Sequence, residues 1–184
     1  MKGLIRTIGF FAFMAIISLS SCKNGGDNAG IDDQGKVRGA SGKDGGIILS
    51  IADADMIQVD ERPQYNTAEW LFRVDKPGRY DVWLSTLTLD TTQLHFNDNV
   101  VITAGETRLA KKPIGDEIVT DDKSVSAPWY RADSHMGSIF FSKAGEYPVQ
   151  VISDRVERHT SDLSQLGKDE HTLINSVILK PKVN

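Results

Sequence analysis

The side chain with the most distinctive chemistry in this sequence is the thiol of Cys22, the single cysteine of the chain. It ends a segment that begins with the positive side chains of Lys2 and Arg6 and continues as an uncharged, mostly apolar run over Ile8–Leu19. A positive start, a short apolar run and small residues at its end are typical of an export signal. The run is too short for a membrane-spanning helix, which needs about 20 apolar residues. With no second cysteine for a disulfide, the thiol of an exported chain is free for another covalent partner.

Leu19-Ser20-Ser21-Cys22 resembles the lipobox of bacterial lipoproteins, L-[AS]-[GAS]-C. The resemblance implies that residues 1–21 are a lipoprotein signal peptide and that the Cys22 thiol is acylated, so that lipid chains hold the protein on a membrane. Lys23 stands where lipoproteins kept in the inner membrane carry an aspartate, which favours the outer membrane of the cell envelope. The alternative is an ordinary secretory signal followed by a chance cysteine.

Residues 22–46 are expected to form a flexible tether, because they contain eight glycines and no aromatic residue and cannot bury enough apolar surface to order themselves. Residues 47–184 have the length of one domain with a single core. Removal of the signal leaves 19 of the 21 basic residues against 25 acidic ones. This acidic balance gives no reason to expect nucleic acid as a partner.

Apolar and polar residues alternate with a period of two through much of residues 47–184, which predicts half-buried β-strands. Lys76-Pro77-Gly78-Arg79 has the composition of a type II turn between two strands, and Asn97-Asp98-Asn99 suits a hairpin turn. No stretch keeps a helical stripe. We therefore expect an all-β fold, an antiparallel β-sandwich, with strands over 47–51, 69–74, 80–85, 93–96, 100–103, 137–141, 147–152 and 172–179.

Four segments carry a more specific resemblance. Residues 68–82 contain the pattern W-x-F-x-V-x-x-P-G-x-Y-x-V, and residues 94–98, 136–147 and 173–179 supply three later landmarks in the same order. Together they resemble galactose-binding-like jelly-roll domains: carbohydrate-binding modules of families 6 and 35 and the accessory modules of bacterial α-L-fucosidases. The resemblance implies the sandwich fold and leaves the ligand open.

In those families an aromatic ring stacks on the apolar face of a sugar and polar groups bind its hydroxyls. The resemblance places Tyr65, Trp129 and Asn175 at positions comparable to the residues of the family's cleft, with Arg131 close by as a polar partner. Trp129 has a structural alternative, since its ring could cover the end of the core under a long loop. Trp83 faces away from Val82 and Leu84, so it either packs in a second layer or forms an exposed platform.

Many members of these families hold a structural calcium, and Asp53, Asp55, Asp60 and Glu61 offer oxygen ligands near the first strand. The spacing lacks the features of an EF-hand loop, so we expect no metal and no cofactor beyond this calcium option. No nucleophile, zinc or nucleotide-binding motif occurs in the chain. We therefore expect no catalytic residues and no enzyme.

Two functions remain open at this point. The chain could be a lipid-anchored glycan-binding module that holds a polysaccharide or oligosaccharide near the cell surface. It could instead be a structural or assembly lipoprotein that uses the same sandwich to bind an envelope protein. An exposed aromatic cleft with convergent polar groups would indicate the first function, and a large flat apolar patch would indicate the second.

Replacement of the single thiol tests the lipid anchor. We expect Cys22→Ser to leave the domain folded and to move the protein out of the membrane fraction, because no other residue of the chain can take its place. The measurement is fractionation of cells labelled with radioactive fatty acid. Label on the variant would contradict the assignment.

Overall fold

The computed structural model describes residues 40–41, 46–120, 122–125, 127–157 and 172–182. The expectations for residues 1–21, for Cys22 and for most of the tether therefore concern parts of the chain outside the described residues. Among the described residues, no helix is long and apolar enough to cross a membrane.

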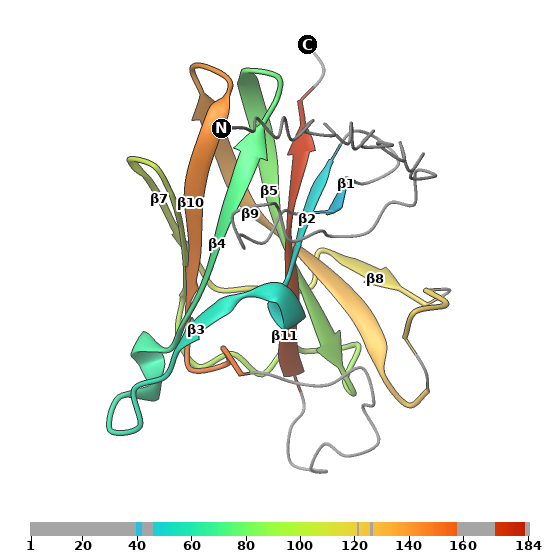
Figure 1. Ribbon diagram of the computed structural model, residues 1–184. Helices are drawn as coiled ribbons and strands as arrows, with labels where there is room; N and C mark the ends of the chain where they lie inside the picture. The colour runs from blue at the N-terminus through green and yellow to red at the C-terminus, as the bar shows by residue number, and fades with distance from the viewer. Residues whose placement is uncertain (1–39, 42–45, 121, 126, 158–171, 183–184) are drawn as a thin grey trace, which may run out of the picture.

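Two antiparallel sheets pack face to face, as the alternating pattern predicts (Figure 1). The six-stranded sheet has the order β1 (Ala40–Ser41), β2 (Ile47–Ser50), β11 (Thr172–Pro181), β5 (Gly78–Thr88), β9 (Tyr130–Phe141) and β8 (Glu117–Val119). The five-stranded sheet has the order β3 (Asp55–Ile57), β4 (Thr67–Val74), β10 (Gly145–Ile152), β6 (Val100–Ala104) and β7 (Thr107–Lys111). Two short 3₁₀ turns, η1 (Ile51–Asp53) and η2 (Pro63–Tyr65), lie before and after β3.

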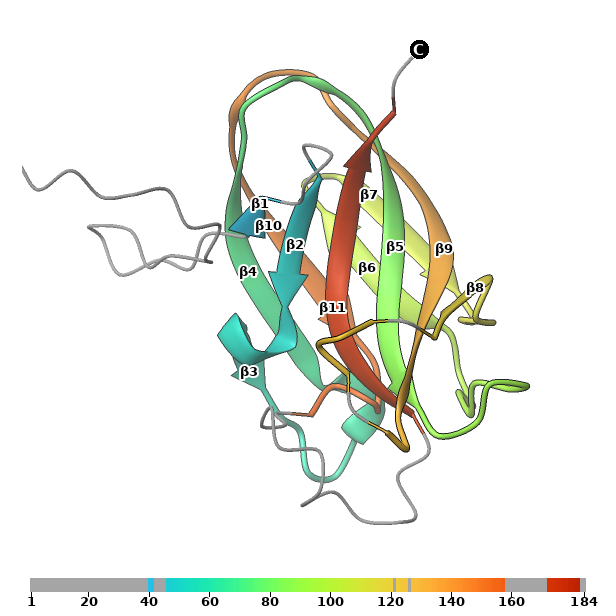
Figure 2. The ribbon, with the colours of Figure 1, turned by 90° about the vertical axis from the view of Figure 1, so that its right-hand side faces the viewer.

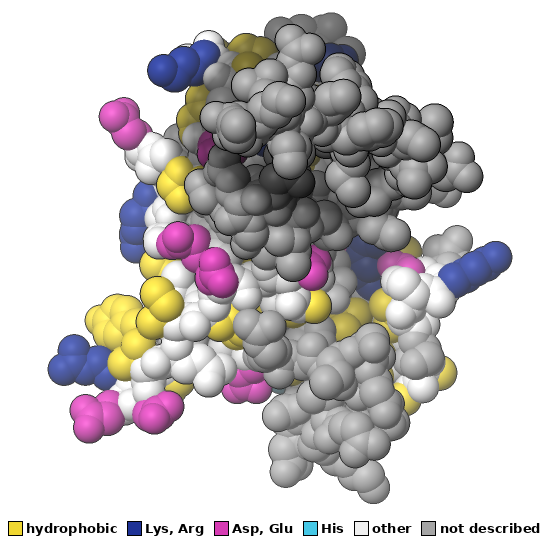
Figure 3. All heavy atoms as spheres, viewed as in Figure 1, with side chains coloured by type: hydrophobic (Ala, Val, Ile, Leu, Met, Phe, Trp, Pro, Cys, Tyr) yellow, Lys and Arg dark blue, Asp and Glu magenta, His cyan; other side chains and the backbone are white. Residues whose placement is uncertain are grey.

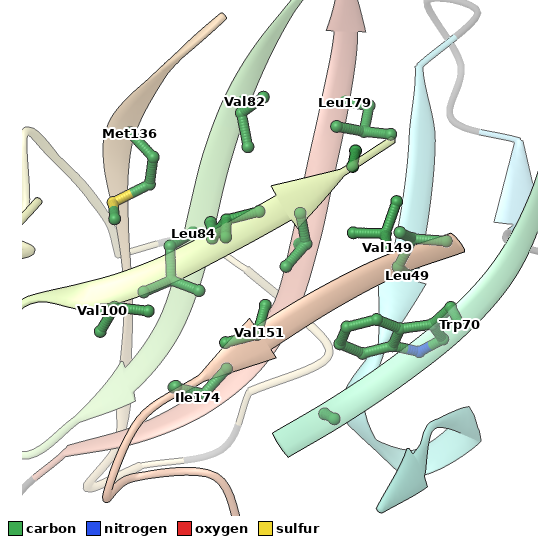
Figure 4. Close-up of a cluster of buried hydrophobic side chains, with 14 of the residues drawn as sticks. Leu49, Trp70, Val82, Leu84, Val100, Met136, Val149, Val151, Ile174 and Leu179 are labelled. Atoms are coloured by element: carbon green, nitrogen blue, oxygen red, sulfur yellow. The ribbon is translucent and has the colours of Figure 1, made fainter. Parts of the chain in front are cut away.

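The core lies between the sheets because each strand turns one face of its period-two pattern inward. Figure 4 shows Val82 and Leu84 of the six-stranded sheet approaching Val149 and Val151 of the five-stranded sheet. Trp70 is buried among them, and its Nε1 donates a hydrogen bond of 2.8 Å to the Ser50 carbonyl of the opposite sheet. That bond satisfies the one polar atom of the indole where it leaves water.

Two similar corners carry the chain from one sheet to the other. The predicted turn at Lys76-Pro77-Gly78 connects β4 to β5, which belong to different sheets, and residues 142–144 connect β9 to β10 in the same way. In each corner a tyrosine hydroxyl donates to a carbonyl four residues earlier: Tyr80 to Lys76 at 2.8 Å and Tyr147 to Lys143 at 2.9 Å. These bonds hold the corners at one end of the sandwich.

One predicted strand is wrong, and others were missed. Residues 93–96 form no strand, although Leu94 and Phe96 are buried in the core as the alternation suggested. Both sides of β6, the strand that follows the predicted hairpin turn, are already taken by β7 and β10, so the segment before β6 cannot pair with it. β3, β7 and β8 were not predicted. β9 begins at Tyr130, earlier than the predicted start at residue 137. The alternating pattern missed its first part because the inward residues there, Ala132 and Ser134, are small or polar.

Part of the expected tether joins the sheet. Ala40 and Ser41 pair with Ile48 and Ile47, so β1 extends the six-stranded sheet beyond β2. An edge strand offers unpaired backbone groups to any segment that passes beside it. The ordered domain therefore gains a short strand from the residues before position 47.

Candidate functional site

A pocket of about 490 Å³ opens at the end of the sandwich opposite the two corners. It lies beside β3 and η2, where β4 begins and where the chain leaves β10. In Figure 3 hydrophobic side chains gather over these elements at the lower left, next to acidic ones. The described residues that line the pocket are mostly polar: Gln58, Val59, Asp60, Pro63, Asn66 and Glu157.

Asn66 holds both walls of this pocket. Its Oδ1 accepts a hydrogen bond of 2.8 Å from the Val59 N–H, and its Nδ2 donates to the Val156 carbonyl at 3.4 Å. Its backbone carbonyl also accepts from the Ser153 N–H at 3.0 Å. Only 7% of Asn66 is exposed, so these bonds form away from competing water. The 58–62 and 153–157 segments are therefore fixed to one amide.

The second wall is also anchored in the core and tied to a neighbouring loop. Val156 is fully buried in the main apolar cluster. Arg155 Nη2 donates 3.0 Å to the His95 carbonyl, and His95 Nε2 lies 3.2 Å from Asp90 Oδ2. Hydrogen bonds, first from Thr92 and then from His95, lower the pKa of the Asp90 carboxyl to about 2. The loops at this end of the sandwich thus support each other.

Tyr65 stands beside the pocket with 54% of its surface exposed. It ends η2, in which Pro63 occupies the first turn and the Tyr65 N–H donates 2.9 Å to the Arg62 carbonyl. The Thr67 hydroxyl donates 2.9 Å to the Tyr65 carbonyl. The backbone is therefore held while the ring is exposed to solvent, and the residues on either side of it in the chain, Pro63 and Asn66, line the pocket. An exposed ring beside polar groups can bind a ligand that has both an apolar face and hydroxyls.

Trp129 lies on the other side of the molecule, against the outer face of the six-stranded sheet. Only 7% of it is exposed, because it packs with Leu87 of β5 and Leu173 of β11, with Leu89 and Val125 alongside. Figure 2 shows the segment between β8 and β9 crossing in front of β5 and β11. The ring is therefore packed, but in a small cluster of its own on the outer face of the sheet rather than over the end of the core, as the structural alternative had it.

Arg131 holds the same segment in place. Its Nε and Nη2 donate to the two carboxylate oxygens of Asp133 at 2.9 and 2.6 Å, and its Nη1 donates to Asp122 at 2.9 Å. The hydrogen bonds with Asp133, and then those with Asp122, raise the pKa of the guanidinium against the opposing effect of burial. Burial acts to raise the pKa of Asp122, but hydrogen bonds from Ser124 and Arg131 hold it below its usual value. Arg131 thus joins the 122–125 segment to β9.

The four residues suggested by the resemblance do not form one cluster. Trp129 and Arg131 are neighbours at the start of β9, and Asn175 lies half-buried in β11, at a bulge in its pairing with β5. Arg131 and Asn175 belong to the six-stranded sheet and Trp129 directly precedes β9 of that sheet, whereas Tyr65 precedes β4 of the five-stranded sheet. None of the four is among the described residues that line the pocket, but Tyr65 lies in the chain between two of them, Pro63 and Asn66.

Sequence reasoning missed Asn66 and Glu157 as site residues. A buried amide is recognised by the backbone groups it bonds, and those of Asn66 lie up to 90 positions away. Glu157 is one of several charged residues before the last strand, and its local sequence carries no site motif. The signal that could have pointed to Asn66 is its place in the sequence, directly after the candidate residue Tyr65.

The aspartates proposed as calcium ligands are not gathered. Within the described ranges, no three His, Cys, Asp or Glu residues lie close enough to hold a metal ion. Asp60 faces the pocket instead, while Asp55 pairs with Glu69 across β3 and β4. We derive no metal chemistry from this site.

Trp83 is half-buried on the outer face of the six-stranded sheet, where the sequence left its role open. The Lys180 ammonium lies 4.7 Å from the centre of its ring, and the His135 ring lies at 5.1 Å. The lysine covers the indole as a cation–π partner. The ring is therefore packed with its own neighbours rather than left as a bare platform.

No family model and no curated protein matches the sequence. Solved structures do resemble the fold. An α-L-fucosidase from Vibrio sp. strain EJY3 matches 78% of this chain and 24% of its own, with 21% identity and a TM-score of 0.59. The CBM35 from Cellvibrio japonicus Abf62 matches 75% of this chain and 94% of its own, with 13% identity and a TM-score of 0.38. The chain spans about a quarter of the fucosidase, and the likeness establishes the all-β sandwich fold.

Removal of the Asn66 amide should loosen both pocket walls. We expect Asn66→Ala to lower the free energy of unfolding by about 1–3 kcal/mol, because it leaves buried backbone groups of Val59 and Val156 without their partner. Urea denaturation followed by circular dichroism measures the change. Asn99→Ala, in an exposed loop, is the control and should stay within about 0.5 kcal/mol of wild type. Equal stability of the two variants would refute the role of Asn66.

Trp129 should contribute mainly to stability. Trp129→Ala removes a buried ring from the cluster with Leu87 and Leu173 and should cost about 3–5 kcal/mol. Guanidinium denaturation gives the value. An unchanged midpoint would mean that the ring is not packed as described.

Proposed function

We propose that this protein is a lipid-anchored lipoprotein of the cell envelope whose β-sandwich binds a glycan without catalysing a reaction on it. The observation that carries the proposal is the pocket beside Tyr65, at the end of a sandwich whose loops are held together by Asn66. In this reading the Cys22 thiol carries the lipid, and the domain holds a polysaccharide or oligosaccharide near the outer membrane.

The pocket has the chemistry that a sugar needs. The Tyr65 ring offers a flat apolar surface for the C–H face of a pyranose. Gln58, Asp60 and Glu157 offer amide and carboxylate groups for hydroxyls at the pocket wall. The volume lies within the range of small-molecule sites, about 300–1,000 Å³, which suits a short stretch of glycan.

The walls are pre-formed, which favours binding. Because Asn66 and Val156 tie both segments to the domain, the ligand need not order them on arrival. The binding free energy is then available for the contacts themselves. A tethered module needs only modest affinity, since its anchor already keeps it at the membrane.

The fold likeness supports glycan as the ligand class. The sandwich corresponds to part of a protein named as an α-L-fucosidase, an enzyme that acts on a sugar.

Tyr65 should be the largest single contributor to binding. We expect Tyr65→Ala to weaken glycan binding by about 1–3 kcal/mol, the range for loss of an aromatic contact, with little change in stability because the ring is exposed. The measurement is a glycan array with the detergent-solubilised mature protein, followed by calorimetry on the best ligand.

Phe140→Ala provides the matched control for Tyr65. Phe140 is 63% exposed and lies near the β9–β10 corner, at the opposite end of the sandwich. Its removal should leave glycan binding unchanged. Equal losses in the two variants, or no glycan bound by wild type, would refute the site.

A further inference from the structure

The charges around the pocket restrict which sugars it can take. Asp60 and Glu157 are the two ionisable side chains among the described lining residues, and both are acidic. Both are exposed to solvent, and exposed carboxyl groups carry negative charge at neutral pH. Their neighbours Glu61 and Arg62 are of opposite charge and offset each other. The lining residues that the structure describes therefore carry a net negative charge.

The two carboxylates come from opposite walls. Asp60 lies in the 58–62 segment, which is tied to Asn66 through Val59, and Glu157 follows Val156, which is tied to the same amide. A ligand between the walls meets a negative group on each side.

The hydrogen-bonding capacity of the pocket points in the same direction. An ionised carboxylate only accepts hydrogen bonds. Gln58 and Asn66 are the lining amides, and Asn66 already uses its Oδ1 and Nδ2 on the backbone of the two walls. The two carboxylates add acceptors and no donors to the pocket, in which the Gln58 amide can both donate and accept. Hydroxyl and ammonium groups can donate to these acceptors, whereas a sugar carboxylate cannot.

We infer that the pocket selects its sugar by charge: it takes amino sugars with a free amine most tightly, accepts neutral sugars, and excludes uronic acids. The inference rests on the proposed glycan-binding function and adds the ligand class to it. A protonated amine between Asp60 and Glu157 gains attraction from both walls, and a uronate in the same place meets repulsion from both.

The test uses two pairs of glycans that differ in one charge. Chitosan oligosaccharides are compared with their N-acetylated forms at a mildly acidic pH that keeps the amines protonated, and polygalacturonate with its methyl ester. We expect the free amine to bind at least roughly fivefold tighter than its acetylated partner, and the ester at least roughly fivefold tighter than the uronate. A factor of five corresponds to about 1 kcal/mol, the Coulomb energy of two unit charges about 4 Å apart in water. Both ratios should shrink as salt is added.

Charge-neutral variants locate the effect. Asp60→Asn and Glu157→Gln should each reduce both ratios, and together they should bring them close to one. Glu106→Gln removes one charge from the exposed β6–β7 turn and is the control, with both ratios as in wild type. A preference that persists in the double variant would belong to the overall negative charge of the protein and would overturn the inference.

The outcomes also separate this inference from the function on which it rests. Binding of neutral glycans that depends on Tyr65 but shows no charge preference, or that favours uronates, would overturn the charge selection and leave glycan binding in place. Absence of binding to any glycan would overturn both.

Discussion

The burial of a single apolar core between two sheets is the constraint on which the rest of this structure depends. Each strand can supply only one face to that core, so the side chains available for binding lie on the outer faces of the sheets or at the ends of the sandwich. The tyrosine corners close one end by satisfying carbonyls of the turns with Tyr80 and Tyr147. The loops at the other end are longer, and the pocket is formed there.

At that end, the structure relies on buried polar groups rather than on apolar packing alone. Asn66 replaces, with its amide and carbonyl, the strand partners that the 58–62 and 153–157 segments lack. A buried amide is costly unless its bonds are made, and here they are made to backbone groups that would otherwise be unpaired. The same bonds therefore stabilise the fold and shape the pocket. A ligand site built on such a clamp stays in place without help from regular secondary structure.

The outer face of the six-stranded sheet shows the opposite use of conspicuous residues. Trp129 and Arg131 together fix a crossing segment to the sheet, the first by packing on Leu87 and Leu173 and the second by bonding to Asp133 and Asp122. Their residue types suggest ligand binding, but their side chains are engaged within the domain. Tyr65, in a 3₁₀ turn with a fully bonded backbone, leaves its ring to solvent. Exposure, rather than residue type, distinguishes the two aromatic residues.

The sequence alone determined the class of fold, because the alternation through Thr67–Val74 and the Pro-Gly corner reflect local backbone geometry that tertiary contacts did not override. The proposal that Cys22 carries a lipid stays a prediction, since it depends on a linear motif in residues outside the described part of the chain. Only the tertiary structure decided that Leu94 and Phe96 reach the core without forming a strand, since β6, with which a hairpin would have paired them, already has β7 and β10 as partners. Likewise, only the folded chain brings Asn66 to Val156 and covers Trp129, because loop side chains are buried or exposed by segments distant in the sequence.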